Sequence, residues 1–196
     1  EGLPPAIAIE QKVISRNPRS TVGTSTEIYD YLRMLFARVG RTYSPVSGVE
    51  VKKHSAEDVV DCMKSHPVGT RFMVLTPLIP HGGRSRKEQL EMDMKQGFSR
   101  IEVDGDVVLI ENYLAGAQES DIDKAEIYLV IDRLVVNDER TTVSRLVDSS
   151  ETALYEGGGK CLLKFLSADG SEPEIAEFSL RFEADGMEFE EPTDHF

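Results

Sequence analysis

The residues best suited to chemistry by type and spacing are Cys62 and His66, which stand four positions apart. On a helix this spacing places both side chains on one face, where they could share a metal ion. A tetrahedral zinc site needs four ligands, however, and no further Cys or His lies nearby in the sequence. We therefore favour a structural role for this pair, and we expect Cys161, within an apolar strand, to lie in the core.

Two D-x-D pairs offer carboxylates, Asp104 with Asp106 and Asp121 with Asp123. A calcium site needs six or more oxygen ligands in a set loop pattern, which neither pair supplies. Gly105, between the first two acids, predicts a turn whose flanking carboxylates are solvated. The sequence therefore predicts turns here rather than a calcium site.

Nucleophilic catalysis and nucleotide binding also lack their usual residues. The four histidines fall at predicted loops or helix ends, with no nucleophile motif around them: His54, His66, His81 and His195. The chain has no G-x-x-x-x-G-K-[ST] motif to hold nucleotide phosphates, and the glycines at 157–159 follow a predicted helix rather than precede one. The sequence predicts neither hydrolase chemistry nor nucleotide binding by this chain alone.

The charge is distributed unevenly along the chain. Residues 1–54 hold 8 of the 22 Lys and Arg but only 5 of the 35 Asp and Glu, so the formal net charge of −13 comes from the remainder. A surface this acidic repels phosphate, which argues against direct nucleic-acid binding and suits a basic protein partner better. Arg84, Arg86 and Lys87 form a small basic spot, either a solvated loop or a docking spot for an acidic patch.

Cellular location is indicated by what the sequence lacks. No apolar run reaches the roughly 18–20 residues that cross a bilayer, and no signal-peptide pattern is present. Two widely separated cysteines are typical of reduced thiols in a cytoplasmic protein. We expect a cytoplasmic protein without membrane contact and, since the chain begins without Met, a segment of a longer polypeptide.

Hydrophobic spacing predicts the elements that position these residues. Helices are predicted over 24–39, where Thr24 and Glu27 form a capping box, and over 55–66, 87–97 and 141–156. Strands are predicted at 6–10, 68–79 and 125–136, in a hairpin around Asp104-Gly105, and in a second hairpin at 160–166 and 174–182. Residues 41–54 are interpreted as a connector. Together these predict an α+β fold, a mostly antiparallel sheet with hairpins packed by about three to four helices.

The first forty residues resemble a known family. The words EGLPPAIAIEQK and NPRSTVGTSTEIYDYLRMLFARVG, with their spacing, closely resemble the first ATPase module of the UvrA family, the ATPases of the ABC excinuclease in nucleotide excision repair. Weaker similarities continue through GTRFMVLTPLIP, QGFSRIEVDGDVVLI, IYLVIDRLVVNDE and SSETALYEGGG. They occur in the order expected of the family's insert that binds the helicase subunit, UvrB.

The resemblance implies three segments. Residues 1–40 belong to the first ABC-type ATPase domain, 41–182 form the UvrB-interaction domain, and 183–196 are a weakly structured acidic tail leading back to the ATPase and zinc-module region. Gln11 matches the Q-loop glutamine that senses the γ-phosphate and Mg²⁺. The Walker A lysine, signature motif and Walker B acid are not in this chain, so it is expected to have no ATPase activity. The parent is expected to use ATP and Mg²⁺, bind damaged DNA and form a dimer.

One departure from the family concerns zinc. The family commonly has a C-P-x-C-G zinc pair just after the insert, where this chain reads FEADGMEF, with acids in place of zinc ligands. A CP-type motif that often follows the first helix is replaced here by TYSPVSG. We therefore expect no zinc in this segment.

The resemblance and the charge pattern together predict a docking module for UvrB. The candidate contact residues are the charged hairpin face, with a basic loop as second choice: Arg100, Glu102, Asp104 and Asp106, then Arg84 and Arg86. Two alternatives stay open. The segment could be part of a nucleotide- or DNA-binding enzyme domain with activity of its own, or it could bind DNA directly without catalysis.

Overall fold

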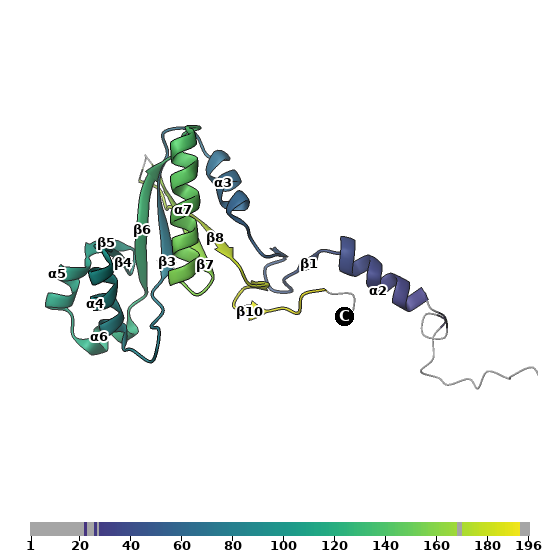
Figure 1. The fold of residues 1–196 in the computed structure, drawn as a ribbon, viewed down its shortest axis with the longest axis horizontal. Helices are drawn as coiled ribbons and strands as arrows, with labels where there is room; N and C mark the ends of the chain where they lie inside the picture. Colours follow the sequence, from purple (N-terminus) through teal and green to yellow (C-terminus); the bar gives the residue numbers. More distant parts are fainter. Residues whose placement is uncertain (1–21, 23–25, 27, 168–169, 193–196) are drawn as a thin grey trace, which may run out of the picture. The chain divides into compact units, whose positions relative to one another are not determined.

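The computed structural model describes residues 22, 26, 28–167 and 170–192 of the chain (Figure 1). The chain divides into two units, the first formed by Glu1–Arg41 with Glu191–Phe196 and the second by Thr42–Glu190. In the first unit the structure describes helix α2 (Ile28–Val39), whose apolar side chains are exposed. The predicted strand at 6–10, the capping box and Gln11 lie outside the described residues.

A six-stranded sheet forms the centre of the second unit. Its order is β5-β4-β6-β3-β7-β8, and every neighbouring pair is antiparallel. The strands are β3 (Arg71–Pro77), β4 (Arg100–Val103), β5 (Asp106–Leu109), β6 (Ile127–Val135), β7 (Lys160–Leu166) and β8 (Glu174–Ser179). The predicted α+β class with a mostly antiparallel sheet is confirmed. The hairpin turn lies where it is predicted, and Asp104 and Gly105 both have positive φ, as a two-residue hairpin turn requires.

Five described helices belong to this unit: α3 (Ala56–Lys64), α4 (Arg86–Gln96), α5 (Ile110–Gly116), α6 (Glu119–Lys124) and α7 (Arg140–Glu156). Capping boxes begin α3 and α4, and Gly97 in the left-handed conformation ends α4. The short helices α5 and α6 are not predicted, because 7 and 6 residues are too few for apolar spacing to show a period. Among the described residues, no helix is both long and apolar enough to span a bilayer.

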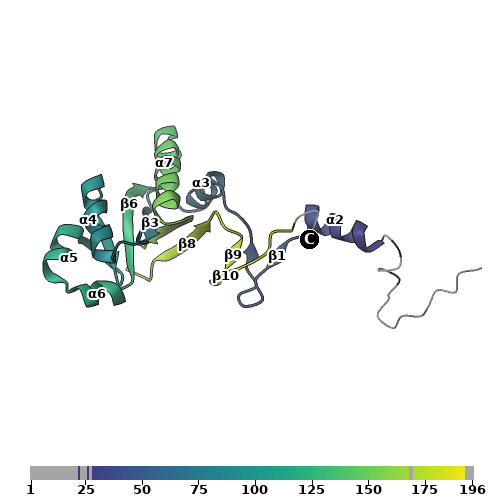
Figure 2. The ribbon, with the colours of Figure 1, turned by 60° about the horizontal axis from the view of Figure 1, so that its bottom comes forward.

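The helices pack on one face of the sheet, as Figure 2 shows for α3, α4 and α7. Two apolar clusters fill this side, one under α3 and α7 with Val59, Phe72 and Leu146 at its centre, the other under α4, α5 and α6 with Leu90, Ile110 and Ile122. The opposite face carries a third cluster made by strand residues: Met73, Leu75, Val130 and Leu162, with Tyr128 beside them. We call this side of the sheet the open face.

Two small hairpins correct the prediction at both ends of the unit. Strand β1 (Thr42–Tyr43) pairs with β2 (Glu50–Val51), and β9 (Glu183–Ala184) pairs with β10 (Met187–Glu188). The interpretation of 41–54 as a mere connector, and of the tail as weakly structured over 183–188, is therefore wrong. Strands of two residues carry no alternation that a sequence pattern could reveal. The second unit reaches Glu190, beyond the predicted boundary at residue 182.

Candidate docking surface

A β-bulge in β6 decides which charges reach the open face. Leu75 lies opposite Val130 while Val74 lies opposite Asp132, so Ile131 is an extra residue on β6. An extra residue reverses the alternation of side chains beyond it. Arg133 consequently lies opposite Met73, on the open face.

The same bulge turns Asp132 toward α7, whose side chains donate three hydrogen bonds to it. Arg145 donates through Nε to Oδ2 at 2.7 Å and through Nη2 to Oδ1 at 2.6 Å, and Ser149 Oγ donates to Oδ2 at 2.9 Å. Burial alone would raise the pKa of Asp132, but the hydrogen bonds from Arg145, the Arg133 backbone N–H and Ser149 outweigh it and lower the pKa. Asp132 is therefore an ionised anchor for Arg145.

A groove of about 580 Å³ opens beside the outer half of β6. It exists because β4 pairs only with residues 127–129 of β6 and leaves the following part of that edge uncovered. Of the described residues, four arginines line it, with Asp132 as the single acid among them: Arg71, Arg100, Arg133 and Arg145. Most of the other lining residues are apolar, including Met73, Phe98, Val135 and Leu166. We call this feature the arginine groove.

Three of these arginines keep their charge available. Arg145 is neutralised by Asp132, but Arg71, Arg100 and Arg133 form no ion pair within the described part of the chain. Arg100 makes one long side-chain hydrogen bond, from Nη1 to Ser99 Oγ at 3.4 Å. Three uncompensated cations beside apolar side chains can bind an acidic protein surface, which an otherwise acidic body would repel.

The structure brings only Arg100, among the residues predicted from the sequence, into this groove. Glu102 is 5% exposed, and its Oε2 lies 2.8 Å from Lys164 Nζ. Asp104 Oδ1 accepts a hydrogen bond from the Glu126 N–H at 3.1 Å, and Asp106 is exposed at the start of β5. Partner contact by these residues stays a prediction, and for Glu102 it would first require breaking a buried ion pair.

The two arginines of the predicted basic loop already form hydrogen bonds within the second unit. Arg86 Nη1 donates to the carbonyl oxygens of Asp123 and Ala125, at 3.0 and 2.9 Å, and so ties the start of α4 to the end of α6. Arg84 lies 3.5 Å from Gln89 Oε1. Docking at this loop also stays untested.

Arg71, Arg133 and Arg145 are not predicted from the sequence as members of one site. The available signal was the Asp132-Arg133 pair, since two charges interrupt an otherwise apolar strand. Which of the two charges lies on the open face depends on the bulge, which the order of apolar and charged residues in the strand does not reveal.

Cys62 and His66 do lie together, in a structural arrangement. The His66 ring stacks on Phe165 with centroids 3.5 Å apart, its Nδ1 lies 2.9 Å from the Cys62 carbonyl oxygen, and its Nε2 lies 3.3 Å from a Glu174 oxygen. Burial, and then the nearby Glu174 charge, raise the pKa of the Cys62 thiol, and burial raises the pKa of Cys161 to about 12. No cluster of three metal-binding side chains occurs within the described residues.

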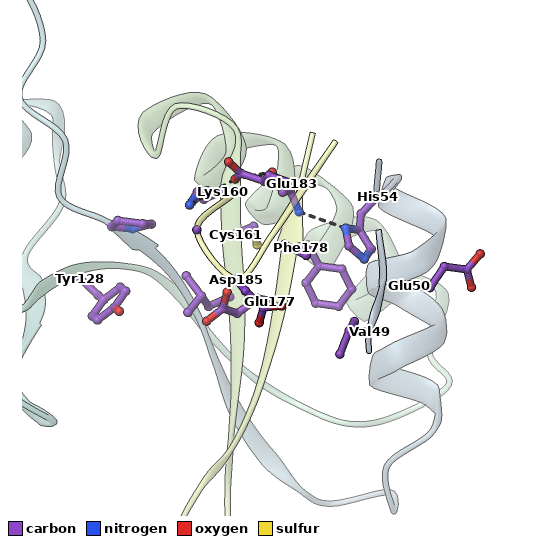
Figure 3. Close-up of a pocket in the computed structure, with 15 residues that line it drawn as sticks. Val49, Glu50, His54, Tyr128, Lys160, Cys161, Glu177, Phe178, Glu183 and Asp185 are labelled. Carbon is purple, nitrogen blue, oxygen red and sulfur yellow. Dashed lines mark hydrogen bonds and ion pairs between the residues drawn. The ribbon is translucent and has the colours of Figure 1, made fainter. Parts of the chain in front are cut away.

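A second hollow, of about 610 Å³, lies between the β7–β8 end of the sheet and the two small hairpins (Figure 3). Four acids line it: Glu50, Glu177, Glu183 and Asp185. Its cation, Lys160, lies 3.2 Å from Glu183. Burial and a 2.6 Å hydrogen bond to Glu126 raise the pKa of Tyr128, in the same lining, to about 12. This hollow has the opposite charge to the arginine groove.

His54, at the edge of this hollow, should make stability depend on pH. Its Nδ1 accepts the Ser179 N–H at 3.2 Å and its ring lies edge-on to Phe178 (Figure 3). Burial, and then the Lys52 charge, lower the pKa of His54 below its usual 6.5. As pH falls, His54 is therefore protonated in the unfolded chain before it is protonated in the folded one. Its contribution to the free energy of unfolding is fully present above about pH 6.5 and is lost as pH drops toward the folded-state pKa.

Urea unfolding between pH 7.5 and 5.5 measures this effect. His54→Asn supplies a non-titrating acceptor and should flatten the pH slope relative to wild type. An unchanged slope in His54→Asn would contradict the assignment.

Sequence similarity to known proteins identifies a family independently of the groove's geometry. A family model described as the UvrA interaction domain matches residues 54–167. UvrABC system protein A of Thermus thermophilus is 42% identical over 182 residues, which are 93% of this chain and 18% of that protein. The proteins of the same name from Bacillus subtilis and Rhizobium meliloti are 41% and 46% identical, over 86% and 84% of this chain and 17% and 16% of their own lengths. The chain thus spans less than a fifth of these relatives.

Proposed function

The chain belongs to the UvrA interaction domain family, and from this premise we propose that it docks the helicase subunit UvrB through the arginine groove. The observation that carries the proposal is the set of three groove arginines that form no ion pair among the described residues, on a body whose net charge is strongly negative. Such a local reversal of sign selects a partner surface that combines acidic and apolar side chains.

The form of the groove supports a protein partner over a nucleic acid. The uncovered edge of β6 and the apolar lining from Met73, Val135 and Leu166 offer contacts that a phosphate backbone does not use. The acidic remainder of the unit would repel a duplex that extended past the groove.

The role of the segment in a longer protein is part of the same proposal. We infer that the parent is the damage-recognition ATPase of nucleotide excision repair, and that Gln11 senses ATP and Mg²⁺ there. Gln11 lies outside the described residues, so the support for its role is the sequence resemblance.

Titration calorimetry of the full chain with UvrB tests the proposal. We expect saturable binding that weakens as salt rises from about 0.05 to 0.5 M, because exposed charge pairs are screened. Titrations with ATP·Mg²⁺ and with a damaged duplex should give no heat of binding. Tight binding of nucleotide or duplex, with no binding of UvrB, would instead favour an enzymatic or DNA-binding module.

A further inference from the structure

The two small hairpins of the second unit share one sequence spacing. Ser44-Pro45-Val46-Ser47-Gly48 and Phe182-Glu183-Ala184-Asp185-Gly186 both have the spacing of C-P-x-C-G, with other residues at the cysteine positions. The closing glycines have nearly the same left-handed backbone, with φ of 71° at Gly48 and 72° at Gly186. Each hairpin therefore makes the kind of tight turn that presents two ligands to a zinc ion.

The positions where such turns carry ligands come together in the structure. Ser44 Oγ and Ser47 Oγ both donate hydrogen bonds to the same oxygen of Asp185, the second at 2.6 Å. Ser44 is only 2% exposed. Three of the four equivalent positions thus meet at one carboxylate oxygen.

The chemistry of this donor set does not fit zinc. Structural zinc sites use thiolates and imidazoles, whereas these positions hold two neutral hydroxyls, one carboxylate and the phenyl ring of Phe182. Both hydroxyl protons are already used in hydrogen bonds to Asp185. The hydrogen bonds from Ser44 and then Ser47 lower the pKa of Asp185, so the acceptor is the ionised carboxylate.

We propose that Ser44, Ser47 and Asp185 form a metal-free clasp, in which charge-assisted hydrogen bonds join the two hairpins as a zinc ion would. The clasp ties hairpin β1–β2 to hairpin β9–β10, and so links the two ends of the second unit.

Each side of the clasp is held in place by its own contacts. The Val46 and Val49 N–H groups donate to Ser44 Oγ and Ser47 Oγ, at 3.2 and 3.3 Å. On the other side, Glu183 accepts a hydrogen bond from Ser179 at 2.9 Å and forms the ion pair with Lys160. The clasp should therefore fold without metal and resist both chelators and thiol oxidants.

Metal analysis of the full chain tests whether the clasp is free of metal. After incubation with excess zinc sulfate and gel filtration, we expect no stoichiometric zinc, and EDTA should leave the melting temperature unchanged. Retained stoichiometric zinc, or a melting temperature lowered by EDTA, would overturn the proposal. Neither measurement involves UvrB, so the result is independent of the docking function.

Substitution tests the clasp itself. Asp185→Ala should lower the melting temperature by about 2–4 °C, because it removes the shared acceptor of both serine hydrogen bonds. Glu188→Ala, which removes an exposed acid of the same hairpin, is the matched control and should not change it. Equal responses would show that Asp185 is not a clasp residue.

A gain of metal binding is the sharper test. The combined variant Ser44→Cys, Ser47→Cys, Phe182→Cys and Asp185→Cys should bind stoichiometric zinc and be destabilised by EDTA. If this variant folds with the wild-type circular dichroism spectrum and binds no zinc, the two turns do not face each other in the proposed geometry.

Discussion

Reversing the charge of Arg133 is expected to weaken UvrB binding by about 10- to 100-fold, or about 1.4–2.7 kcal/mol. Arg133 lies opposite Met73 on the open face and makes no ion pair within the described residues, so its full charge is available to an acidic partner. In Arg133→Glu, a glutamate would face the partner's acids and turn attraction into repulsion. Calorimetry or surface plasmon resonance at low and at high salt measures the change, which should shrink as salt rises.

Arg140→Glu is the matched control for this prediction. Arg140 is exposed at the first position of α7, outside the groove, where a glutamate is favoured by the helix dipole. Equal weakening by both variants would mean that only the total charge matters. Asp106→Arg separates the groove from the hairpin tip, since a strong loss of affinity in that variant alone would assign docking to the tip.

The parts of the fold that were predictable from sequence are those with strong local signals. Asp104-Gly105 specifies the hairpin turn by its backbone preference, and Gly97 specifies the end of α4. The apolar runs of β3 and β7 predict strands, and both faces of these strands are buried. Such signals need no knowledge of distant residues.

The arginine groove was not predictable, because it depends on register. Arg71, Arg100, Arg133 and Arg145 come from β3, β4, β6 and α7, and only the pairing of these elements assembles them. One extra residue in β6 decides that Arg133, not Asp132, faces outward. The same limit applies to Glu102, whose charge predicts exposure but whose partner lies on β7, far away in the sequence.

Breaking the Glu102–Lys164 pair is expected to cost about 3–5 kcal/mol of unfolding free energy. The two residues sit on β4 and β7, with β6 and β3 between them, yet Nζ and Oε2 are 2.8 Å apart. Their side chains are 6% and 9% exposed, and apart from Lys164 the Glu102 Oε2 atom has no hydrogen-bond partner among the described residues. Lys164→Met should therefore leave a buried carboxylate without its counter-charge, and urea unfolding at pH 7.5 measures the loss.

The double variant Lys164→Met/Glu102→Leu separates a structural pair from a partner-binding residue. Replacing both ions with apolar side chains removes the uncompensated charge, so most of the lost stability should return. If the two single losses simply add, the ions are not coupled and the buried pair does not stabilise the open face. In the folded double variant UvrB affinity should equal that of wild type, because Glu102 then acts only within the sheet. A folded double variant that binds UvrB weakly would place Glu102 at the interface, as its sequence position suggests, and would require the pair to open on docking.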